Sequence, residues 1–210
     1  MLSEIKADID TCPKSAADKA LAVRHIRIIE QLAEALQRSY TFLGWEKARD
    51  RSMAENAEWI KRYWPESKLI LWAHNGHIQN KDFRMGAHLK KTFGADYAPI
   101  GFVLGEGTYT ARRTDGDRSI SSDNVLTVPK PGSCEYVLSL LDEEIFLLDL
   151  KRLKEENQGD MDWFLGNFDF REIGAEAKEF IHRNEPIAER YDYLIFIRNS
   201  TASRMIPKAK

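Results

Sequence analysis

The sequence predicts an α/β fold with a mostly parallel sheet flanked by helices and a long N-terminal helical hairpin. Apolar residues recur at helical spacing through the first third of the chain. Beyond that point, short and wholly apolar runs alternate with helical patterns, as is typical of parallel strands covered on both faces; these runs are residues 68–73, 98–104, 144–150 and 193–197. We expect a single domain over residues 1–210, with the hairpin at 1–66 and the α/β part at 67–210.

The hairpin is predicted from two amphipathic patterns. The first covers residues 17–40 and has an apolar stripe on which His25 is expected to be a core residue; its members are Leu21, His25, Ile28, Ile29, Leu32 and Leu36. Gly44 is expected to break this helix. The second covers residues 46–63 and ends before Pro65. Its stripe is formed by Met53, Ala57, Ile60 and Trp64, and we expect Asp50, Arg51, Glu55 and Asn56 to lie off it.

The α/β part follows in order. Residues 85–93 have helical spacing and end at Gly94, and the second strand is expected to continue through residues 109–112 beyond two glycines. Residues 115–124 are polar and predict a loop or an edge hairpin, and a short helix is expected around Cys134. Residues 158–174 lack clear periodicity and predict an ordered irregular loop.

Composition excludes several classes of protein. The net charge is −2, from 31 basic and 33 acidic residues, so we expect neither a nucleic acid nor a membrane as partner. The two cysteines match no zinc motif and predict free thiols in a reducing compartment. The apolar runs are too short to cross a bilayer, and the first residues do not form a signal peptide. A cytoplasmic location is therefore expected.

The stretch LILWAHNGHI, residues 69–78, is the candidate site. It predicts a buried strand that ends in two histidines, His74 and His77, and ligands bind at the carboxyl ends of strands in an open α/β sheet. Two imidazoles there can bind a metal, act as acid and base, or stabilise an oxyanion, and the spacing alone does not select among these roles. A pair of hydrogen-bonded structural histidines is the competing interpretation.

Other polar residues are candidates for the same site. Glu55 either pairs with Arg51 on the surface of its helix or turns inward as the carboxylate beside the histidines. Arg49, Asn75 and Glu106 are expected to contact the substrate, Glu106 because flanking glycines allow the backbone to approach a ligand. No Gly-x-Ser-x-Gly elbow and no phosphate loop is present, so a serine hydrolase or a nucleotide-binding protein lacks its key motif.

Together these segments resemble the erythromycin esterase-like family. The resemblance depends on two signatures that occur in order. The first is RDRSMAEN at residues 49–56, followed by Trp59. The second is WAHNGH at residues 72–77, followed by Met85-Gly86 and Ile100-Gly101-Phe102. Characterised members hydrolyse the lactone ester of macrolide antibiotics, and others are named for succinoglycan biosynthesis. The resemblance implies direct attack by a water molecule that a histidine activates. His74 and His77 match the family's late histidine pair, and Glu55 matches an acidic position of its helix motif.

One departure from the family pattern leaves the activity open. The family's upstream motif, Gly-Glu-x-x-His-Gly, carries the presumed general base and does not occur in these 210 residues. The chain therefore resembles the C-terminal half of a member. We expect a hydrolase of a small-molecule ester or macrolide lactone that uses His74, His77 and Glu55 and is linked to the response to antibiotics. The alternatives are a non-catalytic domain that binds a small molecule, or a divalent metal through His74 and His77, and an inactive fragment. No cofactor is expected, and an unpaired sheet edge predicts a homodimer.

Overall fold

The structure is a computed structural model, and it describes residues 2–114, 116, 119–172, 174–177 and 181–206. The chain forms two compact units. One comprises Met1–His77 and Lys81–Gly94, and the other comprises Ile78–Asn80 and Ala95–Lys210. Among the described helices, none combines the length and the apolar character needed to cross a lipid bilayer.

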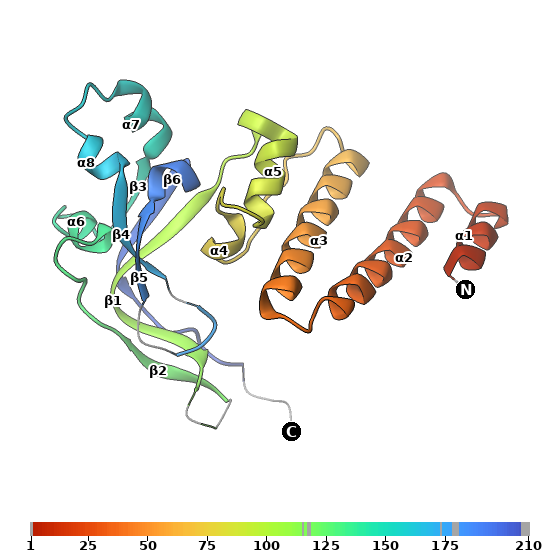
Figure 1. Cartoon of the computed structure of the whole chain (residues 1–210), viewed down its shortest axis with the longest axis horizontal. Helices are drawn as coiled ribbons and strands as arrows, with labels where there is room; N and C mark the ends of the chain where they lie inside the picture. The colour runs from red at the N-terminus through yellow and green to blue at the C-terminus, as the bar shows by residue number, and fades with distance from the viewer. Residues whose placement is uncertain (1, 115, 117–118, 173, 178–180, 207–210) are drawn as a thin grey trace. The chain divides into compact units, whose positions relative to one another are not determined.

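The first unit is helical, and the predicted N-terminal hairpin is present in it (Figure 1). Its helices are α1 (Leu2–Thr11), α2 (Ala16–Gln37), α3 (Phe42–Tyr63), α4 (Asn75–Ile78) and α5 (Met85–Phe93), the last ending at Gly94 as expected. Ser15 and Thr41 cap α2 and α3 by accepting hydrogen bonds from backbone amides in the first turn. Gly44 does not lie between the helices but inside the first turn of α3. A Cβ atom there would lie 2.6 Å from the carbonyl oxygen of Arg38, so only glycine fits.

The prediction for the faces of α2 was wrong. Five of the six residues of the predicted core stripe are exposed, including His25, Ile29 and Leu32, the last two with 55% and 54% of their area accessible. The buried residues of the helix are instead Arg24, Ile26, Gln31 and Ala35. The reason is that α2 packs against α3 through ion pairs, so the polar face is the covered one.

The second unit contains the sheet. Its strands are β1 (Ile100–Arg112), β2 (Ile120–Leu126), β3 (Ile145–Asp149), β4 (Asn167–Glu172), β5 (Ile181–Pro186) and β6 (Tyr193–Ser200). Its helices are α6 (Cys134–Ser139), α7 (Leu150–Glu156), α8 (Asp162–Leu165) and α9 (Ile187–Arg190), and a 3₁₀ turn, Gly94–Asp96, precedes them. The short helix around Cys134 and the strands at 98–104, 144–150 and 193–197 agree with the predictions.

The α/β class is confirmed, but the sheet is not mostly parallel. The order of its four strands is β2-β1-β6-β3, and within this sheet only the β1–β6 pair is parallel. The chain passes from β1 to β2 through a short polar connection, and a connection of that length joins antiparallel strands because a parallel pair needs a long crossover. The predicted edge hairpin is thus β2 against β1, although residues 115, 117 and 118 lie outside the described residues.

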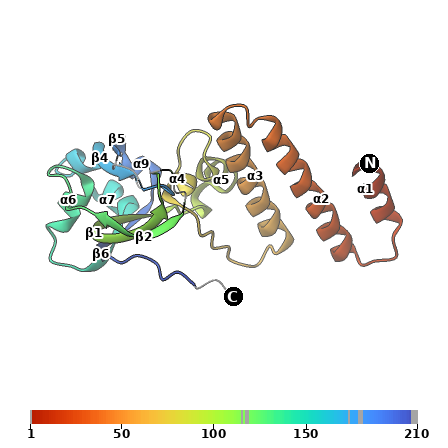
Figure 2. The same cartoon turned by 90° about the horizontal axis from the view of Figure 1, so that it is seen from below.

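One face of this sheet is the main core. Val103, Leu194 and Phe196 are buried there, whereas Ile145 and Leu147 on β3 are 65% and 58% exposed. A second sheet, of β4 paired antiparallel with β5, accompanies the first (Figure 2). The prediction of an irregular loop at residues 158–174 is wrong, because α8 and β4 occupy most of this segment.

β1 continues past Gly105 and Gly107 as far as Arg112, which confirms the continuation predicted through residues 109–112. Gly107 adopts φ 118°, and a Cβ atom there would lie 2.1 Å from the carbonyl oxygen of Ser200 on β6. Glycine lets the two backbones approach closely at this position. Gly107 therefore allows the strand to continue where a larger residue would clash with β6.

The strand predicted at residues 68–73 is absent, although every residue of this segment is described. The segment is irregular, and Ile70 and Trp72 are 88% and 86% exposed. A strand forms only when a neighbour accepts and donates its ladder of hydrogen bonds, and the described strand order has no place for this segment. His74 and His77 therefore do not follow a strand.

Candidate functional site

The candidate site lies within the first unit, where α3 presents two consecutive residues to His77. The Asp50 carboxylate oxygen Oδ1 is 2.9 Å from Nδ1 of His77. The Arg49 guanidinium nitrogen Nη1 is 2.6 Å from Nε2 of the same ring. His77 is held on both nitrogens, and its side chain is 17% exposed, so part of the ring edge still reaches solvent.

Asp50 is a fully buried carboxylate at the centre of this cluster. Its Oδ1 also accepts a hydrogen bond of 2.9 Å from the backbone amide of Met85, the first residue of α5. Its Oδ2 accepts no hydrogen bond from the described residues and lies 3.7 Å from Nη1 of Arg84. Burial by itself raises the pKa of Asp50, but the hydrogen bonds from His77 and Met85 and the charge of Arg84 outweigh it, so this pKa is held below its ordinary value.

These contacts fix the protonation of neutral His77. An arginine side chain has only N–H donors, so Nε2 of His77 must accept the bond from Arg49. The proton of the neutral ring is then on Nδ1, where it is donated to Asp50. The arrangement is a carboxylate–imidazole pair with the lone pair of Nε2 directed away from the carboxylate, which is the form that a general base needs.

His74 has the opposite tautomer. Its Nδ1 accepts a hydrogen bond of 3.0 Å from the backbone amide of Gly76, so the proton of the neutral ring is on Nε2. His74 is exposed and stands directly before α4, where its carbonyl oxygen accepts a hydrogen bond from the amide of His77 at 2.8 Å. The Asn75-Gly76 turn therefore connects one histidine with a donor at Nε2 to another with an acceptor at Nε2.

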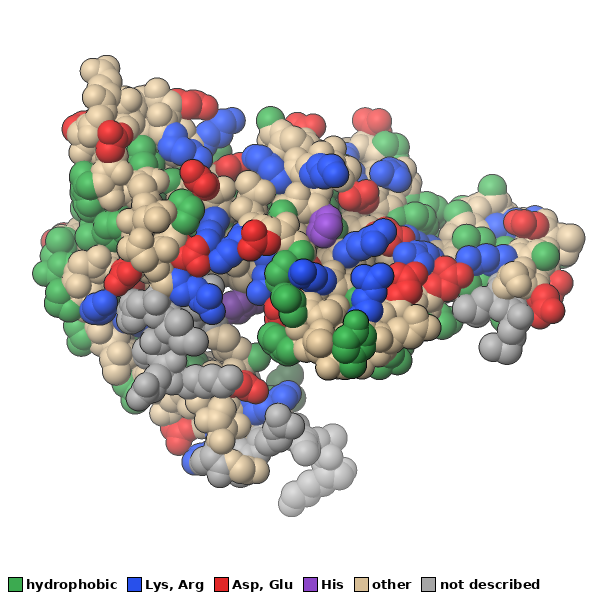
Figure 3. Space-filling view, viewed as in Figure 1, with side chains coloured by type: hydrophobic (Ala, Val, Ile, Leu, Met, Phe, Trp, Pro, Cys, Tyr) green, Lys and Arg blue, Asp and Glu red, His purple; other side chains and the backbone are tan. Residues whose placement is uncertain are grey.

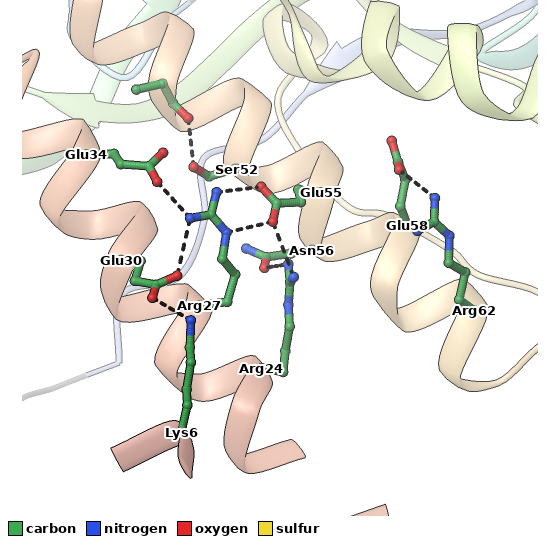
Figure 4. Close-up of polar contacts among 11 residues, drawn as sticks. Lys6, Arg24, Arg27, Glu30, Glu34, Ser52, Glu55, Asn56, Glu58 and Arg62 are labelled. Carbon is green, nitrogen blue, oxygen red and sulfur yellow. Dashed lines mark hydrogen bonds and ion pairs between the residues drawn. The ribbon is translucent and has the colours of Figure 1, made fainter. Parts of the chain in front are cut away.

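The structure does not bring Glu55 to the histidines. Both of its carboxylate oxygens are held by Arg27 from α2, at 2.8 and 3.1 Å, and Arg24 also contacts it at 3.5 Å (Figure 4). The hydrogen bond from Arg27 is the main cause that lowers the pKa of Glu55 to about 2. At 3.6 residues per turn, five residues rotate a helix by about 140° beyond a full turn, so Glu55 and Asp50 cannot reach the same point.

The other predicted site residues have separate positions. Arg49 contacts His77, and Asn75 is the first residue of α4. Glu106 lies on β1 in the second unit, exposed and paired in register with Asn199 of β6. The molecular face in Figure 3 shows basic and acidic side chains interspersed. No group of three or more His, Cys, Asp or Glu side chains in the described part of the chain is arranged to hold a metal ion.

Asp50 was not predicted as a site residue and was expected to lie off the apolar stripe of α3, although the sequence contains a signal for it. Asp50 precedes Met53 by three residues and Ala57 by seven, so it belongs to the apolar stripe of α3 and not to the polar face. An ionisable residue on a buried helical stripe needs a partner. That requirement points to Asp50 before Glu55 as the carboxylate beside a histidine.

The sequence is similar to a known protein family and to a curated protein. The model of the erythromycin esterase family matches residues 2–200. "Putative hydrolase YbfO" from Bacillus subtilis (strain 168) is 23% identical, over 97% of this chain and 48% of its own length. The chain thus spans about half the length of this relative.

Solved structures share the fold. A Bacillus cereus protein superposes with a TM-score of 0.76 at 22% identity, over 96% of this chain and 49% of that protein. A succinoglycan biosynthesis protein gives a TM-score of 0.77 at 21% identity, over 96% and 48%. A mutant of the erythromycin esterase EreC in its open conformation gives 0.59 at 19% identity, over 93% and 50%.

Proposed function

Because the chain belongs to the erythromycin esterase family, we propose that it contributes the histidine part of a hydrolase site that cleaves a small-molecule ester or macrolide lactone, in connection with the response to antibiotics. The observation that supports the proposal is the pair of complementary tautomers. His77 has an acceptor at Nε2 and His74 has a donor at Nε2. Ester hydrolysis by water needs one group of each kind.

In the proposed reaction, the imidazoles of His77 and His74 have different roles. Nε2 of His77 takes a proton from water as the water oxygen bonds to the ester carbonyl carbon, and the carbonyl π electrons move to the oxygen. The N–H at Nε2 of His74 donates a hydrogen bond to that oxyanion. When the tetrahedral intermediate collapses, the bond to the alcohol oxygen breaks and the imidazolium of His77 returns the proton to it. Water and ester give acid and alcohol, with no covalent enzyme intermediate.

Asp50 and Arg49 both contact the imidazole of His77 and have different roles in this scheme. Asp50 is a positioning residue, since its carboxylate keeps the proton on Nδ1 and stabilises the imidazolium that forms. Arg49 occupies Nε2 in the present arrangement and has to move before water can approach. We propose that its guanidinium then binds the ester carbonyl or a neighbouring acidic group of the substrate. Asp50 thereby takes the place of Glu55, which the sequence predicted as the carboxylate beside the histidines.

The experiment is hydrolysis of p-nitrophenyl acetate and of erythromycin by the purified chain and its variants. His77→Asn is expected to lower kcat/KM by about 10²–10⁴-fold, the usual value for loss of a general base. Asp50→Asn is expected to cost between about 10- and 10⁴-fold, because it permits the wrong tautomer. His25→Asn is the matched control, since His25 lies exposed on α2, and it should leave kcat/KM unchanged.

Two outcomes contradict the proposal. If the folded wild-type chain gives no turnover above buffer, the binding-domain alternative replaces it. If His77→Asn and His25→Asn have the same kcat/KM as the wild type, turnover comes from elsewhere and His77 has no catalytic role.

A further inference from the structure

The exposed apolar stripe of α2 is the feature that the proposed function leaves unexplained. Here we call it the α2 stripe, and its members are Leu21, His25, Ile28, Ile29, Leu32 and Leu36. Four of the six have about half of their area accessible, with Ile28 at 44%, Ile29 at 55%, Leu32 at 54% and Leu36 at 56%. Soluble proteins rarely expose an apolar band of this length along one helix unless another surface covers it.

The two other sides of α2 are already occupied. Arg24 and Arg27 bind Asn56 and Glu55 on α3, and Lys6 from α1 reaches Glu30 at 2.6 Å (Figure 4). The α2 stripe lies on the third side, because at 3.6 residues per turn its centre is rotated by roughly 100° or more from the centre of each of the two contact faces. It is therefore a separate surface and not a gap in the packing of the hairpin.

The spacing of the α2 stripe fits a second copy of the same helix as its partner. The six positions are symmetric about the midpoint between Ile28 and Ile29, so the pairs equidistant from it are 21 with 36, 25 with 32, and 28 with 29. When two copies of one helix run antiparallel about a two-fold axis through that midpoint, each stripe residue faces another stripe residue. A sequence without this symmetry would place apolar residues against polar ones in such a pair.

The charges near the two ends of α2 also favour an antiparallel pair of helices. Antiparallel packing places the N-terminus of α2, with the exposed Asp18, beside the C-terminus of the second copy, where the exposed Arg38 stands one residue from the register. Antiparallel helix dipoles attract each other, whereas parallel ones repel. We propose that the α2 stripe is the interface of an antiparallel homodimer of this chain.

The area of the α2 stripe limits the affinity that we expect for the dimer. α2 has 22 residues, and at 1.5 Å per residue and about 10–12 Å in width it offers a footprint of about 330–400 Å² per copy. Stable interfaces bury about 800 Å² per partner. The dimer should therefore be weak and reversible, with a Kd on the order of micromolar or above.

Sedimentation velocity of the full chain from about 1 to 500 μM is the first experiment. We expect a concentration-dependent monomer–dimer equilibrium. Leu32→Glu should weaken dimerisation at least about tenfold, because it buries an unpaired charge at the interface. Val128→Glu is the matched control, since Val128 is 72% exposed in the second unit, and it should leave the equilibrium unchanged. Circular dichroism verifies that both variants fold.

Cysteine cross-linking tests the register. In a Cys12→Ser background, Leu21→Cys and Leu36→Cys variants are oxidised separately and mixed; native Cys134 is buried and burial raises the pKa of its thiol, so it stays unreactive. In the proposed dimer, equal positions in the two copies are about 22 Å apart, too far for a disulfide. Only the mixture should give the cross-linked dimer.

Three results would overturn the proposal. If the chain is monomeric at every concentration, the stripe binds a different partner. If Leu32→Glu dimerises as the wild type does, the interface is another surface such as the sheet edge, and if either single-cysteine variant cross-links alone, the helices are parallel. None of these results bears on the hydrolase proposal, whose readout is turnover.

Discussion

At the scale of single residues, Asp50 determines the chemistry of the candidate site. It receives hydrogen bonds from His77 and from the amide of Met85 while fully buried. One carboxylate oxygen thereby fixes a histidine tautomer and the start of α5 together. Residue types in sequence indicated both histidines but not this carboxylate, because Glu55 and Asp50 look equivalent until the rotation of the helix is considered.

Replacing Asp50 tests its structural contribution. Asp50→Ala leaves the amide of Met85 and Nδ1 of His77 without their acceptor, and each buried donor left unpaired costs about 1–3 kcal/mol of the free energy of unfolding. Urea denaturation at neutral pH measures the loss. Glu156→Ala is the control, because Glu156 forms an exposed pair with Arg152, and such a pair contributes about 0–1 kcal/mol. Equal stability of Asp50→Ala and the wild type would show that the buried carboxylate is not needed for this packing.

At the scale of elements, α2 and α3 associate through charges where the sequence predicted apolar contact. Arg27 binds Glu55 of α3 as well as Glu30 and Glu34 of its own helix, and Arg24 adds a cation–π contact with Trp59 of α3 at 5.6 Å. The sequence predicted both helices, because periodicity defines a helix without its surroundings. It could not predict which face is covered, since that depends on the long-range pairing of arginines on one helix with a carboxylate on the other.

This contact has a definite dependence on pH. The pKa of Glu55 falls from 4.5 to about 2 in the folded chain, mainly through Arg27. Its charged form is therefore favoured by folding, so its contribution to stability is complete above about pH 4.5 and is lost as the pH falls towards 2. The difference in free energy of unfolding between wild type and Glu55→Gln should be largest near neutral pH and shrink across this range.

Urea denaturation at a series of pH values measures that difference. Glu156→Gln, at an exposed pair, should differ little from the wild type at any pH. A wild-type minus Glu55→Gln difference that stays constant from neutral pH to pH 3 would refute the assignment of Glu55 to a stabilising ion pair with Arg27.

At the scale of the whole molecule, the sequence predicted the α/β class and most strands, but not the sheet. Strand direction depends on which strands become neighbours, and β1 turns back directly into β2 while β3 pairs antiparallel with β6. The run at residues 68–73 has the composition of a strand, yet composition cannot supply the neighbour that a strand requires. The family signatures were nevertheless readable, and the family model matches residues 2–200.

The central claim is that His77 and His74 have opposite tautomers suited to acid–base chemistry on an ester. Long-range ¹H–¹⁵N correlation spectra of the histidine rings, recorded above the pH at which they titrate and assigned with His77→Asn and His74→Asn, measure this directly. The account predicts a protonated Nδ1 and an unprotonated Nε2 for His77, with the reverse for His74. A protonated Nε2 on neutral His77 would contradict it, because no lone pair would then be available to accept a proton from water.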